Sequence, residues 1–179
     1  MPRLAALIAL ALLASSCQRT APASLETYTD ATHGFSVQRP LSWHRVESDD
    51  GRRVWFLPAA LPAGETPESR ATEFIVIMTR AEAGPLPEPE VRRLAMSLLP
   101  MHGVSGFQRT PAGTETVIWY RFELTGSTAG EEWASLGTLV TGPRRLHYLV
   151  CAGPLQTWRD RQKLCDQVLK SFSPGDLQK

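Results

Sequence analysis

The sequence lacks the residue patterns by which metal-binding, cofactor-binding and nucleic-acid-binding proteins are usually recognised. It has four histidines, and none pairs with another at metal-ligand spacing: His33, His44, His102 and His147. Its glycines form neither a dinucleotide-binding pattern nor a phosphate-binding loop. The 19 basic residues are balanced by 18 acidic ones and do not cluster beyond pairs, whereas a phosphate backbone needs a sustained basic patch. We therefore expect no metal, no cofactor and no nucleic-acid partner.

A catalytic motif is also lacking. The stretch from His102 to Gly106 superficially resembles the Gly-x-Ser-x-Gly elbow of hydrolases, but the position of the second glycine, 107, is a phenylalanine. We interpret Ser105 as a turn residue rather than a nucleophile. The acidic stretch Asp49-Asp50-Gly51 reads as a turn, because the further oxygen ligands of a calcium loop are missing. The sequence thus predicts a protein that is not an enzyme. The alternative is a hydrolase whose residues meet only in the folded chain.

The N-terminus carries the most specific motif. Arg3 precedes an uninterrupted apolar run, Leu4 to Ala14, that is too short to span a bilayer as a permanent helix. The following Ser15-Ser16-Cys17 resembles the end of a bacterial lipobox, in which the cysteine is acylated and becomes the mature N-terminus. Ala14 departs from this pattern, since leucine is usual there and Leu13 lies one position earlier. The alternative is a plain secretory signal in which Cys17 is incidental.

The lipobox divides the chain into a signal peptide over 1–16, a lipidated Cys17 with a tether to residue 27, a folded domain over 28–173 and a tail over 174–179. Acyl chains such as palmitate would anchor the domain, since each buried CH₂ contributes about 0.8 kcal/mol. The tether reaches at most ~35 Å, which keeps the domain near the membrane. Gln18 is not the aspartate that retains lipoproteins in the inner membrane of enteric bacteria, so the outer membrane facing the periplasm is favoured.

The remaining pattern predicts strands with two helices. We expect strands over 34–39, 53–57, 73–80, 106–110, 115–124, 132–140 and 146–151, the second returning antiparallel to the first. The segment 73–80 is apolar throughout, which is typical of a central strand covered on both faces. Consecutive strands joined by short turns favour an antiparallel sheet. Pro58–Thr72 has no periodicity and is expected to be a loop of about fifteen residues. It is our first candidate for a contact surface.

Both helices have one apolar face. The first is expected to begin near Pro89 and to end before Pro100. The second follows Gly153-Pro154, with Thr157 and Asp160 placed as a capping box. Its apolar stripe is formed by Trp158, Leu164, Cys165, Val168, Leu169 and Phe172.

Several residues resemble the opening signature of the PsbP-like domains, a superfamily that includes the bacterial lipoprotein DcrB and a yeast Ran-binding protein. They are Tyr28, Gly34-Phe35-Ser36-Val37, Pro40 and Trp43, and the ending Ser171-Phe172 also matches. The resemblance implies an α+β fold, an α/β/α sandwich around a mainly antiparallel sheet, with the C-terminal helix packed on the sheet. It implies little about activity, because members serve as accessory, assembly and binding factors. It carries over no metal-binding or partner-binding residue.

Cys151 and Cys165 are predicted to form a disulfide. An export signal places them in an oxidising compartment, where paired cysteines usually cross-link. Cys151 ends the last long strand, and Cys165 lies on the stripe of the helix that should fold back over the sheet. The alternative is two unpaired thiols that pack as small hydrophobes.

These observations predict a lipid-anchored binding or assembly accessory module of the bacterial cell envelope. Its partner would be a protein or an envelope component, and the sequence does not identify the partner-binding residues. The alternative to this and to the hydrolase is a protein that binds a small apolar ligand in a tryptophan-lined cavity. We interpret the tryptophans instead as core residues: Trp43, Trp55, Trp119, Trp133 and Trp158.

Overall fold

The computed structural model describes residues 24–175 apart from residues 49, 83, 98–100 and 115. The lipobox and Cys17 therefore lie outside the described residues, as does most of the expected C-terminal tail.

The described chain forms two sheets, in which every strand pairing is antiparallel. The larger sheet has seven strands, in the spatial order β3 (His44–Glu47), β4 (Arg53–Leu57), β5 (Phe74–Ala81), β9 (Arg145–Pro154), β8 (Glu131–Thr141), β7 (Ile118–Thr128) and β6 (Met101–Gly113). The smaller sheet has the order β1 (Leu25–Asp30), β2 (Phe35–Pro40) and β10 (Ser173–Pro174). The last strand of the chain thus pairs with the second, and the Gly175 N–H donates to the Gly34 carbonyl oxygen at 2.8 Å.

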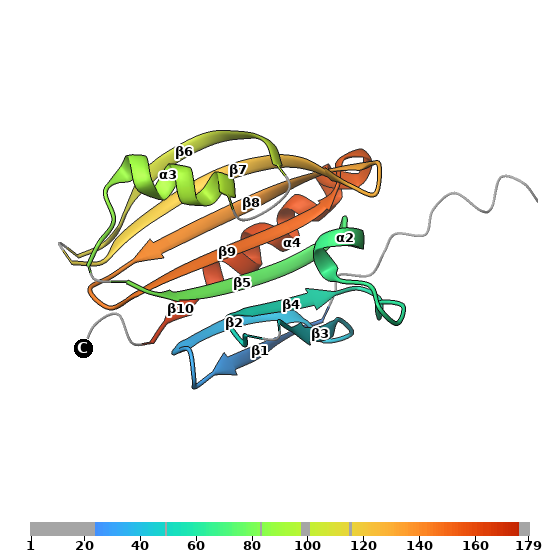
Figure 1. The fold of residues 1–179 in the computed structure, drawn as a ribbon, viewed down its shortest axis with the longest axis horizontal. Helices are drawn as coiled ribbons and strands as arrows, with labels where there is room; N and C mark the ends of the chain where they lie inside the picture. Colours follow the sequence, from blue (N-terminus) through green and yellow to red (C-terminus); the bar gives the residue numbers. More distant parts are fainter. Residues whose placement is uncertain (1–23, 49, 83, 98–100, 115, 176–179) are drawn as a thin grey trace, which may run out of the picture.

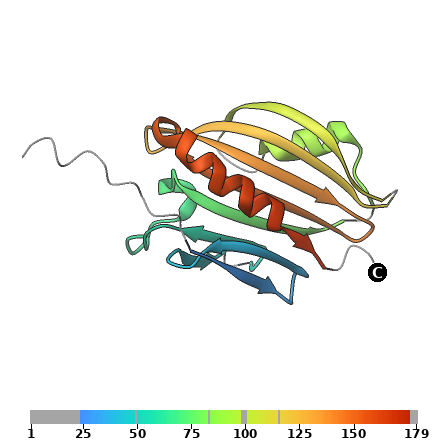
Figure 2. The ribbon, with the colours of Figure 1, turned by 180° about the vertical axis from the view of Figure 1, so that it is seen from behind.

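Helices lie on both faces of the larger sheet (Figures 1 and 2). One face carries α2 (Pro67–Arg70) and α3 (Glu88–Ser97). The other carries α4 (Trp158–Ser171), which the chain enters through the 3-10 turn η1 (Leu155–Thr157). The smaller sheet packs beside α4 on that face, with the rings of Phe35 and Phe172 5.9 Å apart. This arrangement confirms the predicted α+β sandwich and its C-terminal helix packed on the sheet.

Strands β5 and β9 are buried on both faces because their side chains alternate between two hydrophobic cores. In β5, Ile75 and Ile77 point into the core under α4, whereas Phe74 and Val76 point into the core under α2 and α3. Alternation follows from the two-residue period of a strand. The expectation of a central strand covered on both faces is therefore confirmed.

A glycine in β8 makes room for an aromatic stack on the α3 side. Phe122 of β7 faces Gly137 across the ladder, and its ring is fully buried between those of Phe107 and Tyr148. The ring centroids of these neighbours lie 5.8 and 5.6 Å from that of Phe122. A Cβ atom at Gly137 would lie only 2.0 Å from Phe122 Cε2. Only glycine therefore lets this ring lie across β8.

The β7–β8 hairpin is longer than its sequence pattern indicates. The predicted strands 115–124 and 132–140 leave residues 125–131 between them, but pairing continues to Thr128 and resumes at Glu131. The turn consists of Ala129 and Gly130, with φ angles of +52° and +83°. Positive φ at both central residues matches the right-handed twist of the strands, so a two-residue turn suffices.

The edges of the two sheets differ from the prediction. Strand β4 pairs antiparallel with β3. The prediction paired it with the strand over 34–39, which is β2 and pairs instead with β1 and β10. The reason is the corner Leu41–Trp43, which carries the chain from the smaller sheet into the larger one and buries Trp43. Ser105 lies within β6, paired with Glu123, and not in a turn. Strand β1 begins at Leu25, so residues 25–27 of the expected tether belong to the sheet.

Helix α4 spans the expected residues, but the predicted capping box at its start is wrong. The Thr157 side chain makes no capping hydrogen bond, and its hydroxyl donates to the Pro154 carbonyl oxygen instead. A capping residue needs an extended backbone, whereas Thr157 ends the 3-10 turn with φ −110° and ψ 10°. The apolar stripe is as predicted, since Cys165, Val168 and Leu169 are buried against the sheet.

Candidate interaction surface

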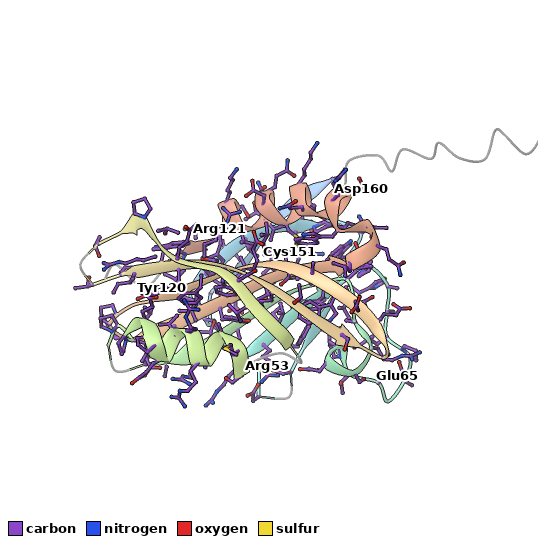
Figure 3. All side chains as sticks on the ribbon, turned by 90° about the horizontal axis from the view of Figure 1, so that it is seen from above. Arg53, Glu65, Tyr120, Arg121, Cys151 and Asp160 are labelled. Carbon is purple, nitrogen blue, oxygen red and sulfur yellow. A yellow bond between two sulfur atoms is a disulfide. The ribbon has the colours of Figure 1, made fainter. Side chains whose placement is uncertain are left out.

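The two cysteines of the folded domain are joined by a disulfide that fastens α4 to the centre of the sheet. Cys151 in β9 and Cys165 in α4 have Cα atoms 5.2 Å apart, and both residues are buried. Cys151 is labelled under the helix in Figure 3. The alternative of two unpaired thiols does not describe this structure. Because both sulfur atoms lie in the core, the bridge has a structural role and offers no thiol to a substrate.

A buried hydroxyl–imidazole pair is the arrangement nearest to a nucleophile beside a base. Thr79 Oγ1 and His147 Nδ1 are 3.0 Å apart, a distance at which such a pair functions in enzymes. Thr79 is 6% exposed and His147 is 0% exposed, and the imidazole lies edge-on to Phe35 and Phe172. No substrate reaches these atoms in this conformation. The pair is part of the core.

A second histidine holds a turn. The His33 N–H donates to Asp30 Oδ1 at 2.8 Å, and His33 Nδ1 lies 2.9 Å from Asp30 Oδ2. Burial alone would raise the pKa of Asp30, but the hydrogen bonds from His33 outweigh it and hold that pKa below its usual value. The Gly34 N–H also donates to the Asp30 carbonyl oxygen. These bonds fix the β1–β2 turn.

His44 and His102 are the remaining histidines that the sequence offered for a catalytic or metal-binding role. His44 is exposed on β3, and the side chain of His102 lies outside what the structure describes. Across the described ranges, no three His, Cys, Asp or Glu side chains gather where they could hold a metal ion. None of the described helices is long and apolar enough to cross a bilayer.

The tryptophans belong to two separate cores and do not line one common cavity. Trp43, Trp119 and Trp158 pack on the α4 side of the sheet. Trp55 and Trp133 pack on the other side, where each makes an edge contact with Phe74. This division agrees with the interpretation of the tryptophans as core residues.

One end of the molecule gathers connecting segments that we call the loop end. It consists of Leu41, residues 58–66, the β7–β8 turn and η1. The strand registers place these segments together, because β1 begins where β2 ends, and β4, β7 and β9 end on the same side of the larger sheet. Figures 1 and 2 show this end from opposite sides, and Figure 3 shows Glu65 and Asp160 at it from above.

The loop 58–66 projects an uncharged tip. Residues 58–64 read Pro-Ala-Ala-Leu-Pro-Ala-Gly, without one charged or hydrogen-bonding side chain, and all except Leu61 are exposed. Leu61 is half-buried against the α3-side core. A solvent-facing loop of a globular protein normally carries polar side chains. The expected contact segment Pro58–Thr72 therefore has an apolar tip, and the structure adds α2 within it.

The base of this loop is held by packing and ion pairs. Pro67 is buried at the start of α2, and Ala71 is buried after its end. Glu65 Oε2 lies 2.8 Å from Arg70 Nε. Glu68 in α2 receives a hydrogen bond of 3.0 Å from Arg53 in β4. The tip is thus presented by a fixed base.

Two leucines extend the apolar surface beside the loop. Leu41 is 58% exposed and Leu155, the first residue of η1, is 44% exposed. The Leu41 N–H donates to the Ser24 carbonyl oxygen at 2.9 Å, so Leu41 lies beside the point where the described chain begins. Met96, which is 55% exposed, lies instead on α3 over the face of the sheet. The exposure of these leucines could not be read from the sequence, because each follows a proline at the end of a strand.

Paired charges border this apolar surface. Arg161 Nε lies 2.8 Å from Glu73 Oε1, and the arginine side chain crosses Gly153 to reach it. Burial raises the pKa of Glu73, and the Arg161 charge partly offsets that effect. The first two residues of β8 add the exposed Glu131 and Glu132. An apolar centre with a polar rim is the general plan of an interaction surface.

Comparisons with known proteins identify the fold. No protein-family model and no curated protein matches the chain. The solution structure of the cyanobacterial PsbP protein (CyanoP) of Synechocystis is similar, with a TM-score of 0.56 and 16% identity over 89% of this chain and 97% of that one. A crystal structure from Bacteroides thetaiotaomicron has a TM-score of 0.54 and 10% identity over 86% of this chain, which spans 50% of that protein. The Ran-binding protein Mog1p of Saccharomyces cerevisiae has a TM-score of 0.49 and 11% identity, over 87% and 97% of the two chains.

The fold is that of the PsbP-like domains, as the residues from Tyr28 to Trp43 predicted. Identities this low establish the architecture alone, because one fold serves many functions. The function must be argued from the chain's own features.

Proposed function

We propose that this protein is a lipid-anchored accessory module of the bacterial cell envelope, which binds a partner and does not transform a substrate. The observation that carries the proposal is the N-terminal pattern, an arginine and an apolar run that end at Ser15-Ser16-Cys17. Acylation of Cys17 would fix the folded domain to a membrane. Gln18 favours the outer membrane, with the domain facing the periplasm.

The disulfide supports export. A bridge between Cys151 and Cys165 forms and persists in an oxidising compartment and is rare where thiols are kept reduced. A periplasmic location satisfies this requirement. The signal and the bridge are independent parts of the sequence that favour the same compartment.

The disposition of reactive groups supports a binding role. His147 is enclosed with Thr79 in the core, and His33 fixes a turn with Asp30. The loop end, by contrast, offers exposed apolar side chains on a fixed base. We propose this surface as the site of contact with a protein or an envelope component.

Metabolic labelling with palmitate tests the anchor. The full chain, expressed in a Gram-negative host, is expected to incorporate the label and to float with membranes in a density gradient. Cys17→Ala should remain as an unlabelled, uncleaved precursor, because the thiol that receives the lipid is gone. Normal release of a mature, unlabelled domain from Cys17→Ala would show an ordinary secretory signal and would refute the anchor.

Cross-linking in intact cells tests the binding role. A reproducible species captured by the anchored chain, and lost when Leu41 and Leu155 are both replaced by glutamate, would support binding at the loop end. Hydrolytic activity of the purified domain towards ester or peptide substrates would refute the accessory role.

A further inference from the structure

We infer that the loop end rests on the lipid bilayer itself, with Leu41, the tip of residues 58–64 and Leu155 in contact with the interfacial region. This inference deepens the proposed function and depends on the anchor at Cys17. It names the partner of the apolar surface as the membrane that carries the protein.

The first argument is the position of the anchor. Residues 18–23 are the only residues between Cys17 and Ser24, so the connection spans at most about 25 Å when fully extended. Ser24 accepts a hydrogen bond from the Leu41 N–H, and β1 starts at Leu25 on the loop end. The tether therefore joins the described domain at the loop end.

The second argument is the chemistry of the surface. Transfer of the exposed leucines and of the proline–alanine tip from water to an acyl boundary is favourable, and no charged side chain of residues 58–64 has to be dehydrated. Pro58 and Pro62 bring no backbone N–H that would need a partner there. At the border, Glu65 is paired with Arg70 and Glu73 with Arg161, and these pairs can remain in the headgroup layer.

The third argument decides between the bilayer and a protein. A short tether makes contact with the bilayer an intramolecular event, so a small apolar surface is enough to populate it. A separate protein would have to bind this small surface from solution, and specific protein interfaces bury far more area than two leucines and a loop tip offer. Glu131 and Glu132 would repel an acidic surface, so the contact should rest on apolar burial, and added salt should not weaken it.

Site-specific photo-cross-linking tests the contact. The full-length acylated chain is reconstituted in vesicles of phosphatidylethanolamine and phosphatidylglycerol, with a benzophenone amino acid at Ala60. The matched control carries the same probe at Thr116, which is exposed before the start of β7 at the opposite end of the sheet. Irradiation should add the mass of one phospholipid to the Ala60 chain and none to the Thr116 chain, at low and at high salt alike.

Substitutions test which side chains make the contact. Leu41→Glu combined with Leu155→Glu should lower the lipid adduct at position 60 about tenfold, because the pair buries roughly one leucine's worth of apolar surface. Met96→Glu, similarly exposed but on α3, should leave the yield unchanged. An intact Cys151–Cys165 bridge and an unchanged circular dichroism spectrum would show that each variant is folded.

The results of these experiments distinguish a failure of the bilayer contact from a failure of the lipid anchor at Cys17. A chain that is acylated and floats with the vesicles, yet gives no more lipid adduct at Ala60 than at Thr116, overturns the bilayer contact and leaves the anchor standing. An adduct at Ala60 to one protein instead of lipid, in native envelope membranes, also overturns it. A chain that is not acylated at Cys17 overturns both proposals.

Discussion

Replacement of Gly137 by alanine tests the aromatic stack on the α3 side of the sheet. The added Cβ would lie 2.0, 2.5 and 2.8 Å from three atoms of the Phe122 ring, distances that real contacts do not show. The ring cannot turn away easily, because Phe122 is fully buried between Phe107 and Tyr148. The clash must therefore move a whole aromatic layer or separate β7 from β8.

Two opposing effects set the magnitude. Alanine in place of glycine restricts the unfolded chain and would by itself stabilise the protein by about 0.4–1 kcal/mol. Overpacking a tight core typically costs about 1–3 kcal/mol, and the contact of 2.0 Å places Gly137→Ala at the upper end. We expect a net loss of about 2 kcal/mol in the free energy of unfolding. For a domain of this size that lowers Tm by about 4–8 °C.

Urea unfolding followed by fluorescence measures the loss, with Gly103→Ala as the matched control. A Cβ at Gly103 meets only Thr125 Oγ1 at 3.6 Å, so that variant should be as stable as the parent or more stable by up to about 1 kcal/mol. Combining Gly137→Ala with Phe122→Leu should cost less than the sum of the two single changes, because the smaller side chain relieves the clash. A Gly137→Ala protein as stable as the parent would show that Phe122 is not confined by this stack.

Two further predictions concern the attachment of α4. Replacing both Cys151 and Cys165 by alanine, or reducing the bridge, should lower the free energy of unfolding by about 3 kcal/mol, because the bridge closes a loop between residues 14 apart. Calorimetry with and without reductant measures this loss. A change below about 1 kcal/mol would contradict the prediction. Hydrogen bonds from Lys170 and, to a smaller extent, from Arg121 lower the pKa of Asp166 below 3.8. Asp166 therefore stabilises the folded state above pH 3.8, and this contribution is lost as the pH falls through the pKa of Asp166 in the folded state. Asp166→Asn should therefore cost less than about 1 kcal/mol at pH 7, because the pair is partly exposed, and this cost should decrease as the pH falls below 3.8. An equal cost at pH 7 and at about pH 2 in urea titrations would refute the assignment.

The sequence predicts the centre of the fold well because burial there leaves a strong periodic pattern. β5 is apolar at successive positions since both of its faces are covered, and α4 shows a clear stripe from Trp158 to Phe172. Cys151 and Cys165 could be paired because a strand followed by a returning helix brings them together. These features depend on local pattern and short connections, which a sequence displays directly.

The edges could not be predicted in the same way. Strand β3 is four residues long and mostly exposed, and β6 contains Gly106 at a φ of +59° and register shifts along its pairing with β7. Propensity is weak in such strands, and their pairing is decided by the corner at Trp43 and by neighbours distant in sequence. The contact between Thr79 and His147 joins residues 68 apart, which no local pattern reveals.

The candidate surface was predicted in part. The lack of periodicity over Pro58–Thr72 located the loop, and its composition is visible in the sequence. Leu41 and Leu155 lie together at the loop end because β2, β4 and β9 all end there. Only the folded chain shows that the apolar tip, the two leucines and the start of β1 share one end of the molecule.

The pairing of β10 with β2 has a consequence for the order in which the protein acquires its structure. The β1–β2 hairpin is synthesised before the rest of the described domain, yet its third strand is formed by Ser173 and Pro174. The residues that pack against this hairpin also come from the last part of the chain, from Cys165 in α4 to Phe172 just after it. An isolated hairpin of two strands is marginally stable in water. The N-terminal hairpin therefore completes its sheet and its packing only after the final residues have emerged.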